Sequence, residues 1–451
     1  MTGIEVFARF CCDKNFRDFD KETITYAKSL CLSGLGMAVR GSMLPAGKVT
    51  AAYAKETGAP PEAGVIGAGF RTSIENAALV NSTASHATEL EDDDMEDGAS
   101  TMTVWPTAFA IGEKLRRSGR EVLEGFVLGY EVHSWIGTAC GAPERGWIVA
   151  MHSGSLGSAA CTAKMLGLNQ YQTEMAIASA ASQGGGLWRT MGTMGHLYEA
   201  GVACRNGISA GMLAKHGLTG NISILEGPRG LCESLTGRGS FDFGALANKL
   251  GKPFRVMLVG IKKYPCCYLL QRIIDGVLEL IAEQKISADD VKSVEVEVNP
   301  LFPVLIQFPE PVDAEQSRFS VSHVVAAMMV EKKISESTFT ETKVADPEIA
   351  RHRKKVKVTV HNEWEAGFMA GVNPVTFKLK DGKELKKICD KLKGHPPYLL
   401  TSDEVVVKFM ECAKDVLGGK EAEKIVKMVL DLDKLDNITE LMSLLTFLKA
   451  R

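Results

Sequence analysis

The sequence lacks the features that would place it in several common functional classes. Its net charge is −3 over 451 residues, so a basic surface for nucleic acid or for an anionic membrane is not expected. None of its 11 cysteines forms a Cys-x-x-Cys pair, which argues against zinc ribbons and redox motifs. No glycine-rich phosphate loop is present. A small-molecule partner, with no nucleic acid, is therefore the expectation.

Membrane and secretion signals are also missing. No apolar run reaches the roughly 18 residues that a membrane span needs, and the N-terminus lacks a basic region followed by an apolar one. We therefore expect a cytoplasmic protein with reduced thiols and no membrane partner. A chain of 451 residues is long enough for two or more domains of about 100–150 residues each.

Helical periodicity dominates the first 260 residues, where apolar residues recur every three or four positions. Two of these stretches are rich in glycine, alanine and serine, which predicts helices that pack closely against others. No βαβ alternation is visible. The predicted helices cover residues 23–39, 73–83, 105–115, 122–138, 154–166 and 177–186.

Beyond residue 260 the pattern changes. Alternating apolar and charged residues predict strands at 291–298, 355–360 and 375–379, the last followed by an Asp-Gly turn, with an apolar helix at 322–330. Helical patterns then return at 405–416, 422–430 and 438–448. The predicted fold class is mainly α with an α+β lid. A helical domain covers 1–260, the lid covers 261–395, and the C-terminal helices of 396–451 complete the helical domain.

Three stretches occur in an order and spacing that resemble the MmgE/PrpD family of 2-methylcitrate dehydratases, cis-aconitate decarboxylases and iminodisuccinate epimerases. They are HATELED at 86–92, GTMGHLYEAG at 192–201 and KKYPCC at 262–267. Shorter matches at 145–147, 318–320, 346–348 and 394–396 support them. The resemblance implies a homodimer with its active site between helical domain and lid, and no cofactor.

The departures from the family pattern suggest altered chemistry or an altered substrate. The family's catalytic aspartate corresponds to Glu89, and a threonine one helical turn later corresponds to Asp93. The lysine of its GTMTK segment falls on His196, and the histidine of that segment falls on Glu199. With fewer fixed positive charges, a tricarboxylate substrate is less expected than in the relatives.

Further departures concern histidines and the lid. A family histidine falls on Ile148, while His152 lies four residues later; another falls on Cys267, and a lid tyrosine falls on His323. The predicted catalytic residues are Glu89, Asp93, His152, His196, Cys267 and His323. The predicted substrate-binding residues are His86, Trp188, Arg189, Glu199, Lys263, Tyr264, Gln271 and Arg318.

The acidic run at 89–97 has three interpretations. It is a solvated loop or helix start, a cation site, or a catalytic pair. If the segment is helical, Glu89 and Asp93 share one face, and two nearby carboxylates raise one pKa to give an acid beside a base. The run lacks the glycine and glutamate spacing of an EF-hand, so no metal is expected.

The other candidates also have alternative interpretations. His152 is either a core histidine or lies at a helix N-terminus that favours an anion. His196 is a loop residue or an acid/base near neutral pH. Cys267 is a small buried residue or a thiolate base, and His323 is a structural residue or completes the site from the lid. Arg318, with Arg189 as a second choice, is a carboxylate clamp or a surface ion pair.

These expectations converge on proton transfer next to a carboxylate. The first prediction is a cofactor-independent hydro-lyase of a small hydroxy-polycarboxylate. The alternatives are a two-base epimerase or isomerase of a dicarboxylate, a decarboxylase of an unsaturated polycarboxylate, and a non-catalytic binding or assembly protein.

Overall fold

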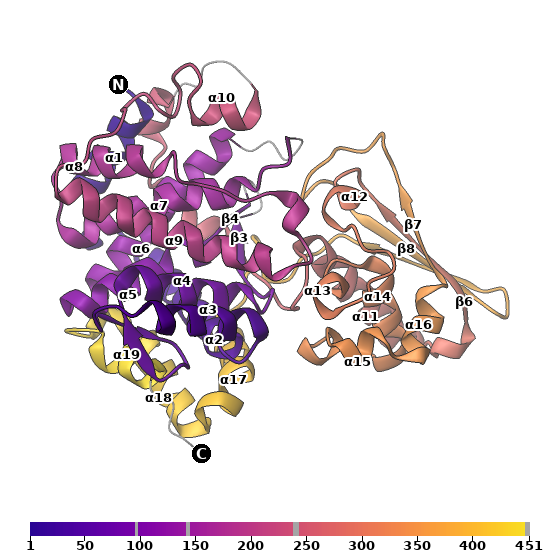
Figure 1. Ribbon diagram of the computed structural model, residues 1–451. Helices are drawn as coiled ribbons and strands as arrows, with labels where there is room; N and C mark the ends of the chain where they lie inside the picture. The colour runs from indigo at the N-terminus through magenta and orange to yellow at the C-terminus, as the bar shows by residue number, and fades with distance from the viewer. Residues whose placement is uncertain (95–97, 141–144, 238–242, 447–451) are drawn as a thin grey trace. The chain divides into compact units, whose positions relative to one another are not determined.

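A computed structural model of the chain describes residues 1–94, 98–140, 145–237 and 243–446. The chain divides into two compact units (Figure 1). The helical unit comprises Met1–Arg189, Met194–Ile261 and Thr401–Arg451, and the α+β unit comprises Thr190–Thr193 and Lys262–Leu400. The predicted fold class, mainly α with a smaller α+β part, is confirmed.

The helices of the helical unit follow the periodic stretches of the sequence. Thr23–Val39 lies within α2, and the 105–115 pattern coincides with α5. One expectation was wrong: α8 ends at Ala180, so the Gln183–Gly186 segment is not helical. Leu448 of the last predicted helix lies outside the described residues. The helices are α1 Gly3–Asp13, α2 Lys21–Gly41, α3 Pro45–Thr57, α4 Ile74–His86, α5 Trp105–Leu115, α6 Gly119–Cys140, α7 Val149–Leu166, α8 Gln170–Ala180, α9 Met194–Lys215, α10 Leu231–Thr236, α17 Ser402–Leu417, α18 Gly419–Leu430 and α19 Thr439–Thr446.

Small residues bring the central helices close together, as their composition predicts. Helix α7 packs against both α6 and α9. A β-carbon at Gly157 of α7 would lie 2.5 Å from Cβ of His133 on α6, and one at Gly207 of α9 would lie 2.4 Å from Cβ of Ser158 on α7. Helix α4 meets α9 in the same way, because a β-carbon at Gly201 would lie 2.3 Å from the carbonyl oxygen of Leu79. These contacts fix the helices that carry the candidate site.

Short strands interrupt the helical unit, where the sequence predicted helices alone. Strands β1 (Ala63–Val65) and β2 (Phe70–Thr72) form an antiparallel pair. Strand β3 (Asp92–Asp94) pairs antiparallel with β4 (Ala99–Ser100) on one side and with β5 (Val259–Ile261) on the other. The acidic run of the sequence therefore contains a strand between its neighbours and not a helix start.

The α+β unit contains a four-stranded sheet in the order β7-β6-β8-β9. Strands β6 and β7 are parallel, whereas β6–β8 and β8–β9 are antiparallel. Helix α11 packs against β8 and β9, and α14 packs against α11, α16 and β7. The elements are α11 Gln271–Gln284, β6 Val291–Val298, α12 Phe302–Leu305, α13 Ala314–Ser317, α14 Val321–Glu331, α15 Glu341–Val344, α16 Pro347–Arg353, β7 Val356–Val360, β8 Asn373–Leu379 and β9 Glu384–Cys389.

The three strands that alternation predicted in this unit are confirmed, and β9 is an additional one. Its residues alternate between exposed and half-buried, with only Cys389 fully covered, so its sequence carries little strand signal. Across the described parts of the chain, no helix is both long enough and apolar enough to cross a membrane.

Candidate active site

The candidate site begins where α4 ends. Ser73 caps the start of this helix, its hydroxyl accepting from the N–H of Asn76, and His86 is its last residue. The chain then turns tightly, with Glu89 in the left-handed region at φ 53° and its N–H donating to the His86 carbonyl at 2.9 Å. This turn places the Nε2 atom of His86 3.9 Å from the Oε1 atom of Glu89. Both side chains are buried.

His196, in the first turn of α9, approaches the same carboxylate. Its Nε2 atom lies 3.9 Å from Oε1 of Glu89, and its ring meets that of His86 edge-on with centroids 4.6 Å apart. His86 in turn places Nδ1 3.3 Å from the carbonyl oxygen of Leu197. The structure therefore brings two predicted site histidines from different helices onto one buried glutamate.

Glu199 extends the group by one helical turn. Its Oε2 atom lies 3.7 Å from Nδ1 of His196, as i,i+3 spacing on a helix permits. Its Oε1 atom accepts from the N–H of Leu187 at 3.4 Å. We call His86, Glu89, His196 and Glu199 the acid/base cluster.

His152 lies in the first turn of α7. The sequence predicted a helix that begins only at residue 154, which would have placed His152 just before it. Only 7% of its surface is exposed, and neither ring nitrogen has a hydrogen-bond partner among the described residues. Burial lowers its pKa to about 4, an effect that Glu199 partly offsets. A buried imidazole without partners costs about 1–3 kcal/mol, and such groups are characteristic of sites that bind or react.

The surroundings of His152 include residues that sequence analysis did not select. The Trp147 ring meets the imidazole edge-on at 5.1 Å. The backbone of Gly184 lies against it, so that a β-carbon there would come within 2.7 Å of Nδ1. The glycine-rich end of the predicted 177–186 helix was the available signal, because glycine often marks close backbone approach.

Three residues of the acidic run, Asp92–Asp94, form strand β3, on which successive side chains point to opposite faces. Asp92 accepts from Ser33 at 2.9 Å and lies 3.3 Å from Nζ of Lys408, while Asp94 pairs with Arg255 at 3.1 Å. Asp93, between them, points to the opposite face of β3. The helical condition under which Glu89 and Asp93 would share a face is not met. Glu96 and Asp97 lie outside the described residues.

Two further predicted site residues, Trp188 and Arg189, lie between α8 and α9. Trp188 is half-buried and packs against an apolar group that includes Ile148 and Met151. Its N–H donates to the carbonyl of Gly146 at 3.0 Å. Arg189 is exposed.

Other predicted residues lie in the α+β unit, and they contact one another and neighbouring backbone. The N–H of Cys267 donates to the carbonyl of Arg318 at 3.0 Å, and the Arg318 guanidinium donates to the carbonyl of Pro265 at 3.0 Å. His323 is fully buried, with Nε2 3.0 Å from the carbonyl of Thr338. Arg318 also lies 4.0 Å from Glu315, but it is buried and so is not at the surface, as its alternative interpretation had it.

The loop before α11 uses the remaining predicted residues. The Gln271 amide accepts from the N–H groups of Lys263 and Tyr264 at 3.2 and 3.0 Å. Lys263 Nζ and the Tyr264 hydroxyl both contact Asp275, at 2.7 and 2.8 Å. Burial, reinforced by Asp275, raises the pKa of Tyr264. Within this unit these contacts hold the loop in place.

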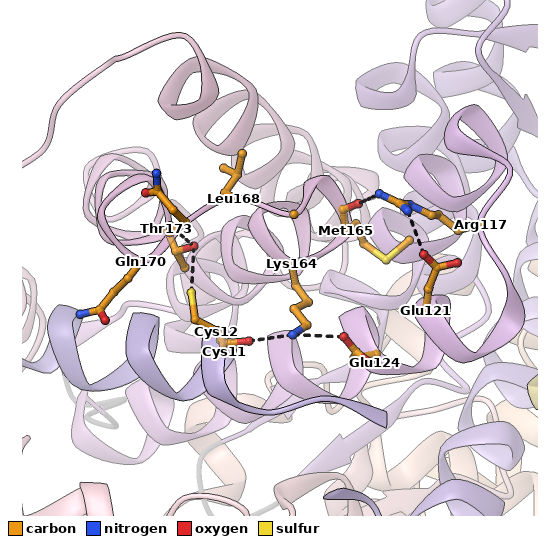
Figure 2. Close-up of a pocket in the computed structure, with 12 residues that line it drawn as sticks. Cys11, Cys12, Arg117, Glu121, Glu124, Lys164, Met165, Leu168, Gln170 and Thr173 are labelled. Atoms are coloured by element: carbon orange, nitrogen blue, oxygen red, sulfur yellow. Dashed lines mark hydrogen bonds and ion pairs between the residues drawn. The ribbon is translucent and has the colours of Figure 1, made fainter. Parts of the chain in front are cut away.

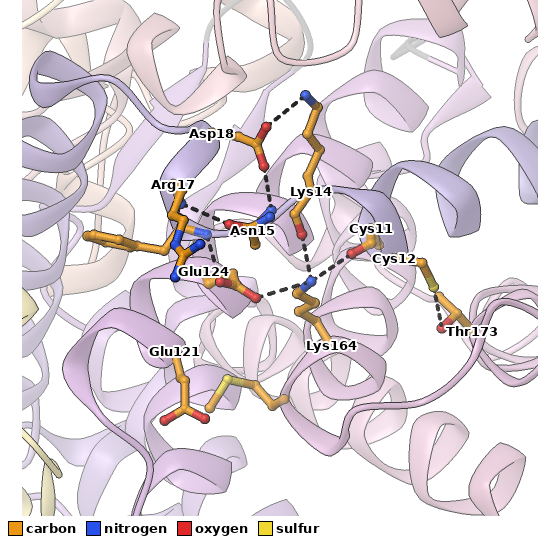
Figure 3. A network of polar contacts seen from close by, with 12 residues as sticks. Cys11, Cys12, Lys14, Asn15, Arg17, Asp18, Glu121, Glu124, Lys164 and Thr173 are labelled. Atoms are coloured by element: carbon orange, nitrogen blue, oxygen red, sulfur yellow. Dashed lines mark hydrogen bonds and ion pairs between the residues drawn. The ribbon is translucent and has the colours of Figure 1, made fainter.

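A separate cavity of about 430 Å³ opens in the helical unit (Figure 2). Its lysine, Lys164, lies 3.1 Å from Glu124 and donates to the carbonyls of Cys11 and Lys14. Figure 3 shows this network joining the end of α1 to α7. Because Lys164 already contacts groups of the protein, this cavity is a weaker candidate for ligand binding than the acid/base cluster.

Comparison with known proteins identifies the same scaffold along almost the whole chain. Residues 5–244 match the profile of the MmgE/PrpD N-terminal domain, and residues 264–434 match that of the C-terminal domain. Cis-aconitate decarboxylase of Aspergillus terreus is 25% identical over 95% of this chain and 92% of its own length. The enzymes of that name from Homo sapiens and Mus musculus are 25% and 24% identical, each over 94% of this chain and over 90% and 89% of their own lengths.

Proposed function

Because this chain belongs to the MmgE/PrpD family, as its motifs predicted, we propose that it is an acid/base enzyme acting on a small carboxylate. The proposed reaction is the elimination of water from a hydroxy-polycarboxylate, or its reverse. The observation that carries the proposal is the buried Glu89 carboxylate, 3.9 Å from a ring nitrogen of each of two histidines. Acid and base groups are held together there by two helices.

His152 is the proposed base. Its pKa of about 4 keeps the ring neutral at physiological pH, so a nitrogen lone pair is available to accept a proton. A neutral ring is less suited to binding a substrate carboxylate by charge, which argues against the anion role considered for it. General base catalysis contributes about 10²–10⁴-fold when the pKa of the base lies near the operating pH, and the negative charge of a bound substrate carboxylate would raise the pKa of His152 toward that range.

The proposed proton donor is the acid/base cluster. Removal of a proton α to the carboxylate leaves an electron pair that forms the new C=C bond as the C–O bond breaks. A proton delivered from His196 to the departing hydroxyl completes the water molecule. Glu89 and Glu199 lie 3.9 and 3.7 Å from the two nitrogens of His196 and hold its ring in place for this step.

Decarboxylation is the second candidate. The relatives that cover 94–95% of this chain carry the name cis-aconitate decarboxylase, and this favours an unsaturated polycarboxylate as substrate. In that case a C–C bond breaks with loss of CO₂, and the cluster protonates the carbon that is left. An epimerase would need bases on two sides of the substrate carbon, and a non-catalytic protein would need none.

Proton NMR in D₂O separates these reactions. The purified full chain is incubated with malate-like hydroxy-dicarboxylates, citrate, 2-methylcitrate and cis-aconitate. Loss or addition of water is the expected result. Release of CO₂ would favour the decarboxylase, and deuterium exchange without net conversion would favour the epimerase. Efficient turnover of 2-methylcitrate or cis-aconitate would contradict the preference for a smaller substrate.

Variants connect the reaction to the site. His152→Gln and Glu89→Gln are expected to lower kcat by about 10²–10⁴-fold, with His216→Gln at the far end of α9 as the control. His216 is exposed and lies about 20 residues along the helix from His196, or about 30 Å. Equal activity of all three variants would contradict the proposal. The homodimer implied by the family remains a prediction, and light scattering should give twice the chain mass of 48.7 kDa.

A further inference from the structure

We propose that His86, Glu89 and His196 together bind one divalent transition-metal ion, of the Zn²⁺ or Co²⁺ type. The three residues each offer one ligand atom, and these atoms lie within 4.8 Å of one another. Two imidazoles and one carboxylate form a common ligand set for catalytic zinc, in which the fourth position stays open. The ion's role in turnover rests on the proposed function, whereas its binding does not.

The distances suit a shared ion better than direct hydrogen bonds. Each histidine Nε2 lies 3.9 Å from Glu89 Oε1, beyond the range of about 2.7–3.2 Å for a hydrogen bond. Metal–ligand bonds of about 2.0–2.2 Å in a tetrahedron place ligand atoms about 3.3–3.6 Å apart. The two distances to Glu89 need to close by only a few tenths of an ångström around an ion, and all three ligand atoms lie within 4.8 Å of one another.

The second ring nitrogen of each histidine also fits metal binding. His86 Nδ1 lies 3.3 Å from the carbonyl oxygen of Leu197, and His196 Nδ1 lies 3.7 Å from Oε2 of Glu199. Metal-bound histidines characteristically direct the nitrogen that does not bind the metal to a carbonyl or carboxylate, which fixes the ring and leaves the other nitrogen unprotonated. Both rings thus present Nε2 toward Glu89.

Burial completes the argument. His86 and Glu89 are each 1% exposed and His196 is 5% exposed. A divalent ion at this place would offset the charge of the buried carboxylate and accept both imidazoles in their neutral form. The open position would accept the hydroxyl oxygen of the substrate and polarise it, and this would replace the proton that His196 supplies when no ion is bound. Proton removal would then remain with His152.

The test uses Co²⁺ alone, without substrate. The full chain is treated with EDTA, dialysed and titrated with Co²⁺, and the visible d–d absorption is followed. The expected result is saturation at one Co²⁺ per chain, displaced by Zn²⁺. His86→Gln and His196→Gln should each abolish this signal, while His216→Gln should retain it. Glu199→Gln should weaken binding about 10–100-fold, because it removes the carboxylate that orients His196.

Thermal melts identify any variant that fails to fold, and Glu89→Gln, which keeps the side-chain size, provides a second ligand deletion. No Co²⁺ signal, or a signal that survives the histidine substitutions in folded protein, would overturn the metal site. Turnover by the EDTA-treated protein without Co²⁺ binding would remove the metal site and leave the proposed function standing. Co²⁺ binding at the cluster without turnover of any polycarboxylate would support the metal site and remove the proposed function.

Discussion

Gly184 lies so close to His152 that a β-carbon on the glycine would come within 2.7 Å of both Cα and Nδ1 of the histidine. Such contacts are too short, so Gly184→Ala must displace the imidazole or the backbone. We expect kcat to fall by about 10-fold or more, since small misplacements of a catalytic group are costly. Gly185→Ala is the matched control, because its β-carbon would meet nothing within 4 Å. Equal kinetics of the two variants would contradict a role for His152.

Glu89 tests the acid/base cluster without changing its packing. Glu89→Gln keeps the size of the side chain and removes its charge. The expected result is a loss in kcat of about 10²–10⁴-fold, because the cluster loses the carboxylate that lies 3.9 Å from both His86 and His196. The melting temperature should not fall, since a buried charge is replaced by a neutral group. A lower melting temperature with unchanged kcat would make Glu89 a structural residue.

His133 gives the stability a defined pH dependence. Its Nε2 accepts from the N–H of Ser100 at 3.0 Å, and its Nδ1 lies 2.9 Å from the hydroxyl of Ser153. Burial lowers its pKa to about 3, against about 6.5 when unfolded. Between these values the unfolded chain binds a proton that the folded chain does not, so this contribution to stability is complete above about pH 6.5 and is lost as pH falls toward 3.

The measurement compares His133→Gln with the parent by chemical unfolding from pH 7 down to pH 5. The variant should lack up to about 1.4 kcal/mol per pH unit of the parent's slope. His216→Gln serves as the control because His216 is exposed, and it should follow the parent. Parallel curves for parent and His133→Gln would show that His133 is not neutral in the folded state.

Lys408 is expected to stabilise the turn that contains Glu89, through its contacts with Leu90 and with strand β3. Its Nζ donates to the carbonyl of Leu90 at 2.7 Å and lies 3.3 Å from the buried Asp92. Lys408→Met should reduce the free energy of unfolding by about 3–5 kcal/mol, because it leaves a buried carboxylate without its cation. Asp92→Asn in the same chain should recover part of that loss, which a double-mutant cycle measures.

Lys424 provides the control for this prediction. It forms an exposed ion pair with Glu440, so Lys424→Met should change stability by less than about 1 kcal/mol. Similar losses for Lys408→Met and Lys424→Met would contradict the importance of the buried pair.

The sequence predicted the helices well because apolar residues recur every three or four positions along many residues of each helix. The 105–115 pattern matches α5 from end to end. Strand β3 was missed for a physical reason: three consecutive aspartates look solvent-exposed. They are buried because Lys408 and Arg255, which lie far away in the sequence, neutralise two of them. No local pattern carries that information.

The candidate site also has features that the sequence predicted and features that it did not. His86, Glu89 and His196 were selected from motifs, and the i,i+3 relation of His196 and Glu199 follows from helix geometry. That His86 and His196 meet depends on the close packing of α4 and α9, through Gly201. The backbone approach of Gly184 to His152 requires the loop after α8, which the sequence predicted as helix. Long-range packing, and not residue type, decided these points.

Arg318 provides the last test, because its two possible roles predict different measurements. It is 3% exposed, donates to the carbonyl of Pro265 at 3.0 Å and lies 5.5 Å above the ring of Phe339. Lysine cannot reproduce this planar arrangement, so Arg318→Lys should lower the free energy of unfolding by about 1–3 kcal/mol. Arg351→Lys, at an exposed ion pair with Asp289, should change it by less than about 0.5 kcal/mol. If Arg318 is a substrate clamp, the variant would instead keep its stability and raise KM, because it loses the bidentate contact to a carboxylate. Chemical unfolding and steady-state kinetics on the same preparations distinguish the two roles, and we expect the loss of stability.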